Sequence, residues 1–66
     1  MSPDQVEDVL ARTRFTADGL VPAIAQQWDT REVLMMAWMD AAALRETLET
    51  GRGVYFSRSR GSRWVK

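Results

Sequence analysis

The sequence predicts an α+β protein that contains, in order, a short helix, an antiparallel β-hairpin, a second helix and the start of a second hairpin. Three observations support this order: a helix-start signal at residues 2–5, two mainly apolar runs on either side of a polar turn, and a second helical stretch between an aspartate and a glycine. A chain of 66 residues buries only about 60% of the surface that it exposes when unfolded. We therefore expect residues 1–66 to form one small domain or fragment, with residues 1–19 as an N-terminal helix and loop.

The first helix is predicted from Pro3 to about Arg12. Ser2 suits the N-cap, Pro3 suits the first helical position, and Gln5 stands where a capping box has its reciprocal partner. Three apolar side chains then recur at helical spacing: Val6, Val9 and Leu10. Isolated helices below roughly 12 residues are marginal in water, so this helix needs packing against the rest of the chain.

The first hairpin is predicted from residues 20–28 and 32–39, with a polar turn at residues 29–31. Residues 33–38 are apolar without alternation, which is typical of a strand that is covered on both faces. We expect a helix on one face and another sheet or subunit on the other. Arg31 is an unsuitable residue wherever the turn requires a positive φ.

The second helix is predicted over residues 41–50. Asp40 is a natural N-cap, and Gly51 stands just past the end, where helices commonly stop. Leu44 and Leu48 lie one turn apart and are predicted to form the buried stripe.

Charge is distributed unevenly, although the nine cationic and nine acidic residues cancel overall. Residues 1–50 contain four arginines and nine acids, a net charge of −5, whereas residues 51–66 contain five cations and no acid. A basic end on an acidic chain indicates an anionic ligand, nucleic acid, or docking against an acidic segment. Within the second helix, Arg45 and Glu49 are expected to form a weak, solvated pair.

Composition excludes several kinds of site. The chain has no cysteine and no histidine, which removes disulfides, the usual soft zinc ligands and the commonest acid–base side chain. No catalytic residue is identified, because the acidic residues do not converge and no nucleophile stands beside a base. No apolar run approaches the roughly 20 residues that cross a bilayer, and the acidic start does not resemble a signal peptide. A cytoplasmic protein is therefore the default expectation.

The most informative stretch is residues 55–66, YFSRSRGSRWVK, which combines four cations, three serines, one glycine and three aromatics. Apolar runs flank residues 57–63, so the polar residues are predicted to form the tip of a hairpin. Such a tip can bind phosphate through hydroxyls, backbone amides and arginine, although it is also compatible with a solvated loop. Phe56 and Trp64 fit a core position better than a stacking position, because strand aromatics usually pack inward.

Three segments together resemble phosphoribosyl-AMP cyclohydrolases: residues 33–40, 43–51 and 55–66. The resemblance runs from about Leu20 to Lys66, so residues 20–66 are interpreted as a cyclohydrolase-like N-terminal part. It implies the hydrolytic opening of the adenine ring of phosphoribosyl-AMP, between N1 and C6, in histidine biosynthesis. It also implies an intertwined homodimer.

By matching the family motif, the resemblance implies substrate- or phosphate-binding roles for Ser57, Ser59, Arg60, Trp64 and Lys66, with Arg58 and Arg63 as weaker candidates. Family members continue past this motif into a segment that carries magnesium-binding aspartates and zinc-binding cysteines. This sequence does not contain that segment, so we expect no metal ligand in it and no activity from the isolated chain. Arg31 stands where a glycine is common in the family.

Two alternatives belong to other functional classes. A small single-stranded nucleic-acid-binding module could use the basic hairpin with Phe56 and Trp64, and it would show strongly salt-dependent binding. A purely structural fragment could instead dimerise through residues 33–39, and its properties would not depend on Arg60.

Overall fold

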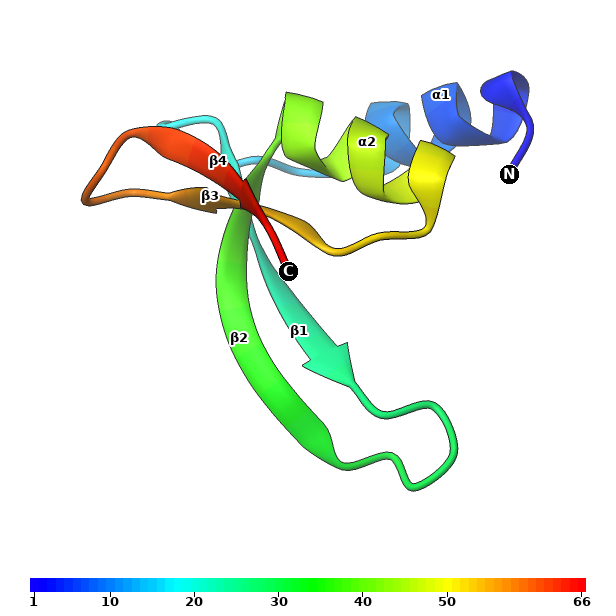
Figure 1. Ribbon diagram of the computed structural model, residues 1–66. Coiled ribbons are helices and arrows are strands. Elements are labelled where there is room, and N and C mark those ends of the chain that lie inside the picture. Colours follow the sequence, from blue (N-terminus) through cyan, green and yellow to red (C-terminus); the bar gives the residue numbers. More distant parts are fainter.

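The computed structural model describes residues 1–66 and contains two helices and one four-stranded antiparallel sheet (Figure 1). The strands lie in the order β1-β2-β3-β4, so each pairs with its neighbours in the chain. The predicted α+β order is confirmed. The elements are α1 (Pro3–Arg12), β1 (Leu20–Gln26), β2 (Val33–Asp40), α2 (Ala41–Thr50), β3 (Val54–Ser57) and β4 (Ser62–Val65).

The start of α1 is the predicted capping box. The Ser2 hydroxyl accepts a hydrogen bond from the Gln5 backbone amide at 3.2 Å, and the Gln5 side chain accepts one from the Ser2 amide at 2.9 Å. These bonds satisfy two donors that would otherwise face only water. Val6 is the fully buried side chain of α1, with 1% of its surface exposed.

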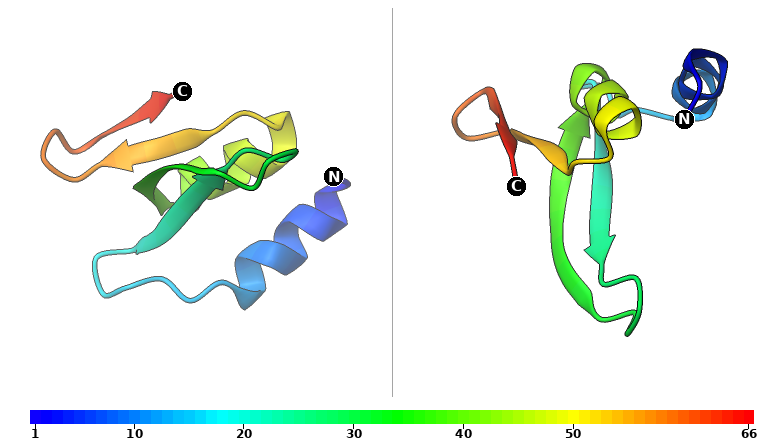
Figure 2. Two further views of the ribbon diagram at one scale, coloured as in Figure 1. Left: turned by 90° about the horizontal axis from the view of Figure 1, so that it is seen from below. Right: turned by 45° about the vertical axis from the view of Figure 1, so that its right-hand side comes forward.

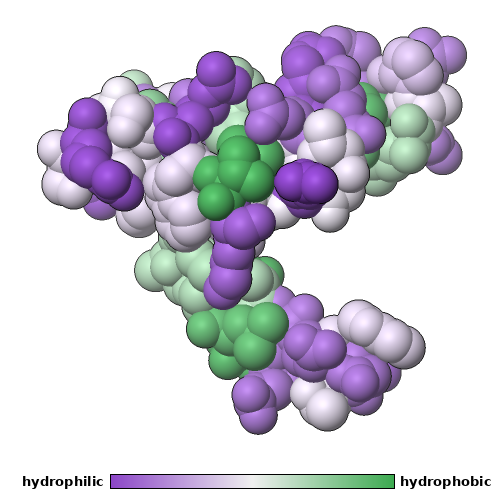
Figure 3. Space-filling model, viewed as in Figure 1, coloured by the Kyte–Doolittle hydropathy of each residue, from purple (hydrophilic) through white to green (hydrophobic).

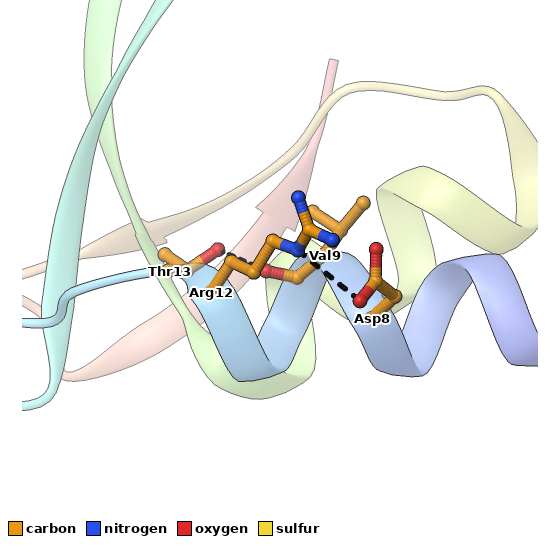
Figure 4. A network of polar contacts seen from close by, with 4 residues as sticks. All are labelled: Asp8, Val9, Arg12 and Thr13. Carbon is orange, nitrogen blue, oxygen red and sulfur yellow. Dashed lines mark hydrogen bonds and ion pairs between the residues drawn. The ribbon is translucent and has the colours of Figure 1, made fainter.

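The end of α1 is closed by two polar contacts (Figure 4). The Thr13 hydroxyl donates to the Val9 carbonyl oxygen at 2.6 Å. One turn apart on the exposed side, Arg12 Nε donates to Asp8 Oδ1 at 3.2 Å. Of these two contacts, the Thr13 hydroxyl provides a partner for a backbone carbonyl near the end of the helix, and the Arg12–Asp8 pair joins two side chains.

β1 and β2 form a long hairpin, which we call the arm, with seven residue pairs from Leu20↔Asp40 to Gln26↔Val33. The arm extends away from the helices (Figures 1 and 2). At its tip, Arg31 has a φ of 63°. Its amide donates to the Gln27 carbonyl at 2.8 Å and its carbonyl accepts from the Gln26 side chain at 2.6 Å. The turn therefore places Arg31 in a conformation that favours glycine.

The predicted cover over both faces of β2 is only partly present. Met39, at the helix end of the strand, is 6% exposed and packs in the core. Farther along the arm, Met36 is 59% exposed and its cross-strand partner Ile24 is 68% exposed. Within this chain one face of the arm therefore lacks the predicted cover, and a covering subunit remains a prediction.

The core lies where α2 meets the sheet. Its four buried residues are Met39, Ala43, Val54 and Tyr55. Half-buried side chains from the sheet and α2 pack against them. Both predicted helix signals are confirmed, because Asp40 Oδ1 accepts from the Ala43 amide at 2.7 Å and Gly51 adopts a left-handed φ of 77°.

Two predictions about α2 are wrong in detail. The innermost residue is Ala43, with 0% exposure, whereas Leu44 and Leu48 are half-buried. Arg45 pairs with Glu7 of α1, Nη2 to Oε1 at 2.6 Å, and not with Glu49. The reason is tertiary: α1 lies beside α2 (Figure 1) and brings a carboxylate within reach of Arg45 from outside the helix.

β3 and β4 form the second hairpin, which we call the basic hairpin, with four residue pairs from Val54↔Val65 to Ser57↔Ser62. Thr47 ties its start to α2, because the Thr47 hydroxyl accepts from the Val54 amide at 3.0 Å and donates to the Val54 carbonyl at 3.3 Å. A single register pair, Trp38↔Phe56, connects the basic hairpin to the arm. The two hairpins project in different directions (Figures 1 and 2). No helix of the protein has both the length and the apolarity needed to cross a membrane.

Candidate functional site

The turn of the basic hairpin brings three of the predicted site residues together. The Ser57 hydroxyl accepts from the Arg60 backbone amide at 3.3 Å and lies 3.4 Å from the Ser59 hydroxyl. The turn is closed by a hydrogen bond from the Gly61 amide to the Ser57 carbonyl at 2.8 Å, with Gly61 at a φ of 64°. Ser59 and Arg60 are exposed. The turn therefore presents hydroxyls and a guanidinium to solvent on an ordered backbone.

The strand register decides which side chains share a face with this turn. Tyr55 pairs with Trp64 and Ser57 pairs with Ser62, and directly paired residues project from the same face of a sheet. Trp64 is half-buried and packs on Tyr55 with ring centroids 4.8 Å apart and planes tilted by 34°. This packing agrees with the interpretation of Trp64 as a core-facing aromatic.

Lys66 lies at the other end of this hairpin. Its backbone amide donates to the Gly53 carbonyl at 2.9 Å, and its ammonium contacts the Met35 sulfur of the arm at 3.2 Å. Lys66 stands four positions after Ser62, a distance of about 13 Å along an extended strand. The predicted residues therefore divide into a cluster at the turn and two positions, Trp64 and Lys66, nearer the core. No enclosed pocket joins them.

The opposite face of the same hairpin carries a second set of cations and aromatics. Arg63 pairs with Phe56, and Phe56 pairs with Trp38 of the arm. The Arg58 guanidinium carbon lies 5.1 Å from the centroid of the Trp38 ring, within the range of a cation–π contact. Sequence reasoning missed the pairing of Arg58 with Trp38, because no local pattern links residues 20 positions apart.

The site carries a positive charge because its cationic side chains have no acidic partners. Both ion pairs of the protein lie in the helices, Arg12 with Asp8 and Arg45 with Glu7. None of the five cations in residues 51–66 forms an ion pair, and this segment contains no acid. Clustered like charges of this kind attract anions and raise their local concentration.

The acidic residues do not fit a metal site. No group of three aspartate or glutamate side chains converges anywhere in the protein, and histidine and cysteine do not occur in the sequence. Magnesium and zinc sites usually combine several such ligands.

Comparisons with known proteins agree on one family. The family model "Phosphoribosyl-AMP cyclohydrolase" matches residues 35–66, which include β2 from Met35, α2 and the whole basic hairpin. Curated proteins that carry the same name are similar over most of the chain. Their identities are 71% over 58 residues for Paramagnetospirillum magneticum, 61% over 66 residues for Thermobifida fusca and 58% over 66 residues for Rhodospirillum centenum.

These matches cover 88%, 98% and 100% of this chain, but only 44%, 57% and 50% of the respective relatives. The chain spans about half the length of the curated relatives it matches. The match to the Rhodospirillum centenum protein includes all of the first 19 residues, and the match to the Thermobifida fusca protein extends into them. The chain is therefore similar, over most or all of its length, to about half of a phosphoribosyl-AMP cyclohydrolase.

Proposed function

We propose that this chain supplies the substrate-holding part of an enzyme that hydrolytically opens the adenine ring of phosphoribosyl-AMP, between N1 and C6, in histidine biosynthesis. The observation that carries the proposal is the ordered basic turn of Ser57, Ser59 and Arg60, which lies inside the segment matched by the family. The substrate carries phosphate groups. Arginine forks and hydroxyls are groups that proteins use to bind phosphate oxygens.

Each turn residue has a distinct part in the proposal. The Arg60 guanidinium forms no ion pair and remains available for a bidentate contact with a phosphate. The Ser59 hydroxyl is exposed and can donate to the same group. The Ser57 hydroxyl accepts a hydrogen bond from the Arg60 backbone amide and thereby orders the turn. It can still donate a hydrogen bond to a phosphate oxygen.

Trp64 and Lys66 are assigned to the same substrate at a greater distance from the turn. Thioether sulfur is a weak acceptor, so the Lys66 ammonium gains by exchanging Met35 for a phosphate oxygen. Trp64 is half-buried beside Tyr55, and an aromatic ring at this position can stack on a flat base. A substrate with phosphates at separate positions can reach both ends of the hairpin.

The metal chemistry implied by the family resemblance is assigned to residues outside these 66. The chain has no cluster of ligands for zinc or magnesium, so its own part in the reaction is to bind and orient the substrate. We also propose a cytoplasmic location, in keeping with a role in amino-acid biosynthesis.

A homodimer is part of the proposal because of the uncovered arm. Five of its large apolar side chains are exposed, from Trp28 at 87% to Leu34 at 49%: Ile24, Trp28, Val33, Leu34 and Met36. Figure 3 shows apolar surface along the arm above its polar tip. Contiguous apolar surface of this kind marks an interaction site. A second copy of the chain is the partner that we propose for it.

The test places the chain in a full-length relative. Residues 1–66 replace the matched half of the Rhodospirillum centenum protein, which aligns with the whole chain, and ring opening of phosphoribosyl-AMP is followed by absorbance. We expect an active chimera in which Arg60→Ala raises KM by about 10- to 100-fold, since a hydrogen bond to a charged group contributes about 1.5–3 kcal/mol.

Arg14→Ala is the control, because Arg14 is exposed, forms no ion pair and lies far from the turn in the sequence. An active chimera in which Arg60→Ala behaves like Arg14→Ala would contradict the assignment of the turn. Salt-dependent binding of generic single-stranded oligonucleotides to the 66-residue chain, without selectivity for the phosphoribosyl substrate, would favour a nucleic-acid-binding module instead.

A further inference from the structure

The joint between the arm and the basic hairpin has little backbone pairing. β2 and β3 share one register pair, Trp38↔Phe56, whereas the arm has seven pairs and the basic hairpin has four. One pair defines a point of contact between two strands but constrains their relative direction weakly. Side chains around the joint must therefore contribute to the angle at which the basic hairpin leaves the arm (Figure 2).

Arg58 is placed to do this on one side of the joint. It follows Phe56 by two residues, and its guanidinium carbon lies 5.1 Å from the centroid of the Trp38 ring on β2. Trp38 itself is half-buried. Arg58 forms no ion pair, and the tryptophan ring is the one partner of its guanidinium.

The contact on the other side of the joint is weaker in kind. Lys66 reaches Met35 of β2, but its ammonium meets a thioether sulfur, which is a poor acceptor. A planar guanidinium on a tryptophan face is the more favourable arrangement. Val54 and Tyr55 at the base of the basic hairpin pack with Met39 of the arm in the core. Beyond this core, the Arg58–Trp38 contact is the stronger of the two side-chain contacts that link the basic hairpin to the arm.

We propose that Arg58 is a positioning residue. Its contact with Trp38 fixes the direction of the basic hairpin relative to the arm, and thereby the place of Ser59 and Arg60 in the molecule. Arg58 then acts through Trp38, whereas Arg60 is the arginine that meets the anion. The consequence for substrate binding rests on the proposed function, but the effect on the direction of the hairpin does not.

The first experiment measures that direction in the 66-residue chain. Residual dipolar couplings of backbone amides in β1–β2 and in β3–β4 report whether the two hairpins share one alignment. We expect one common alignment in the wild type and a reduced degree of order for β3–β4 in Arg58→Ala and in Trp38→Leu. Arg52→Ala is the matched control, since Arg52 is an exposed arginine at the base of the same hairpin with no aromatic partner.

The second experiment uses the active chimera and a double-mutant cycle. Arg58→Ala and Trp38→Leu should each raise KM by about two- to fivefold, which corresponds to an exposed cation–π contact, with kcat unchanged. The double variant should be no worse than either single variant, because both changes remove the same contact. Trp38→Phe retains an aromatic face and should recover most of the loss.

Two results would overturn the proposal. One is a common alignment of the two hairpins that survives both Arg58→Ala and Trp38→Leu in a folded chain. The other is a KM effect of Arg58→Ala that adds fully to that of Trp38→Leu, which means that Arg58 meets the substrate directly. An inactive wild-type chimera would count against the proposed function, and the dipolar couplings would still decide the role of Arg58.

Discussion

At the scale of single residues, the turn at the tip of the arm carries a conformational cost. Arg31 has a φ of 63°, and a left-handed conformation costs a residue with a Cβ roughly 1–2 kcal/mol. The turn keeps this conformation because the backbone of Arg31 is hydrogen-bonded on both sides, through its amide to Gln27 and through its carbonyl to the Gln26 side chain.

Replacing Arg31 by glycine should therefore stabilise the protein. We expect Arg31→Gly to raise the free energy of unfolding by about 0.5–1 kcal/mol, because the relief of strain exceeds the added entropy of the unfolded chain. Urea denaturation measures the change. Thr30→Gly is the control. Arg31 is the one non-glycine residue with a positive φ, so glycine at the neighbouring position 30 relieves no strain and should not stabilise the protein.

At the scale of elements, a single hydroxyl joins α2 to the basic hairpin. Thr47 both donates to and accepts from the Val54 backbone, at 3.3 and 3.0 Å, and Val54 itself is 1% exposed. An amide and a carbonyl left unpaired at a buried position lose their hydrogen bonds without gaining water.

Thr47→Val should thus destabilise the protein by about 1–3 kcal/mol, while the shape of the side chain is retained. Thr50→Val is a matched control, because the Thr50 hydroxyl donates to the Glu46 carbonyl on an exposed part of the same helix. Thermal or urea unfolding that shows equal losses for the two variants would contradict this role of Thr47.

The two helices are joined by an exposed ion pair between Arg45 and Glu7. Their side chains are 45% and 57% exposed, so solvent and salt screen the interaction. We expect Glu7→Gln to lower the free energy of unfolding by about 0.2–1 kcal/mol at low salt and by less at high salt. Glu49→Gln should leave the free energy of unfolding unchanged. A larger loss of stability for Glu49→Gln than for Glu7→Gln would show that Arg45 pairs with Glu49 within α2 and would contradict this assignment.

At the scale of the whole molecule, the arm is the part that the chain leaves uncovered. Met36 and Ile24 are cross-strand partners and are exposed together, and a hydrophobic pair in water contributes little to the stability of one chain. Their burial would become favourable on association, at about 25 cal/mol per Å² of apolar surface removed from water.

Met36→Glu should accordingly abolish self-association without unfolding the single chain. Sedimentation velocity over a range of protein concentrations measures the association. Ala17→Glu is the control. Ala17 is exposed in the loop before β1, so this substitution adds the same negative charge away from the apolar face of the arm. Self-association of Met36→Glu equal to that of Ala17→Glu would rule out this face of the arm as the interface.

Sequence reasoning was most reliable where the signal and its partner are close in the chain. The capping box of Ser2 and Gln5, the Asp40 N-cap and the left-handed Gly51 were all predicted and are all present. It was wrong about Arg45, whose partner is 38 residues away. It also missed the contact of Arg58 with Trp38.

The sequence by itself determined the order of the elements, the limits of both helices, the basic character of the last hairpin and the resemblance to a family, because these depend on residues within a few positions of one another. It did not give the strand limits, since β1 ends at Gln26 and not at residue 28. Only the tertiary structure decided how Trp64 packs on Tyr55 and how Trp38 and Met35 of the arm contact Arg58 and Lys66. The physical reason is that strand register and the crossing of the two hairpins bring together residues that no local periodicity connects.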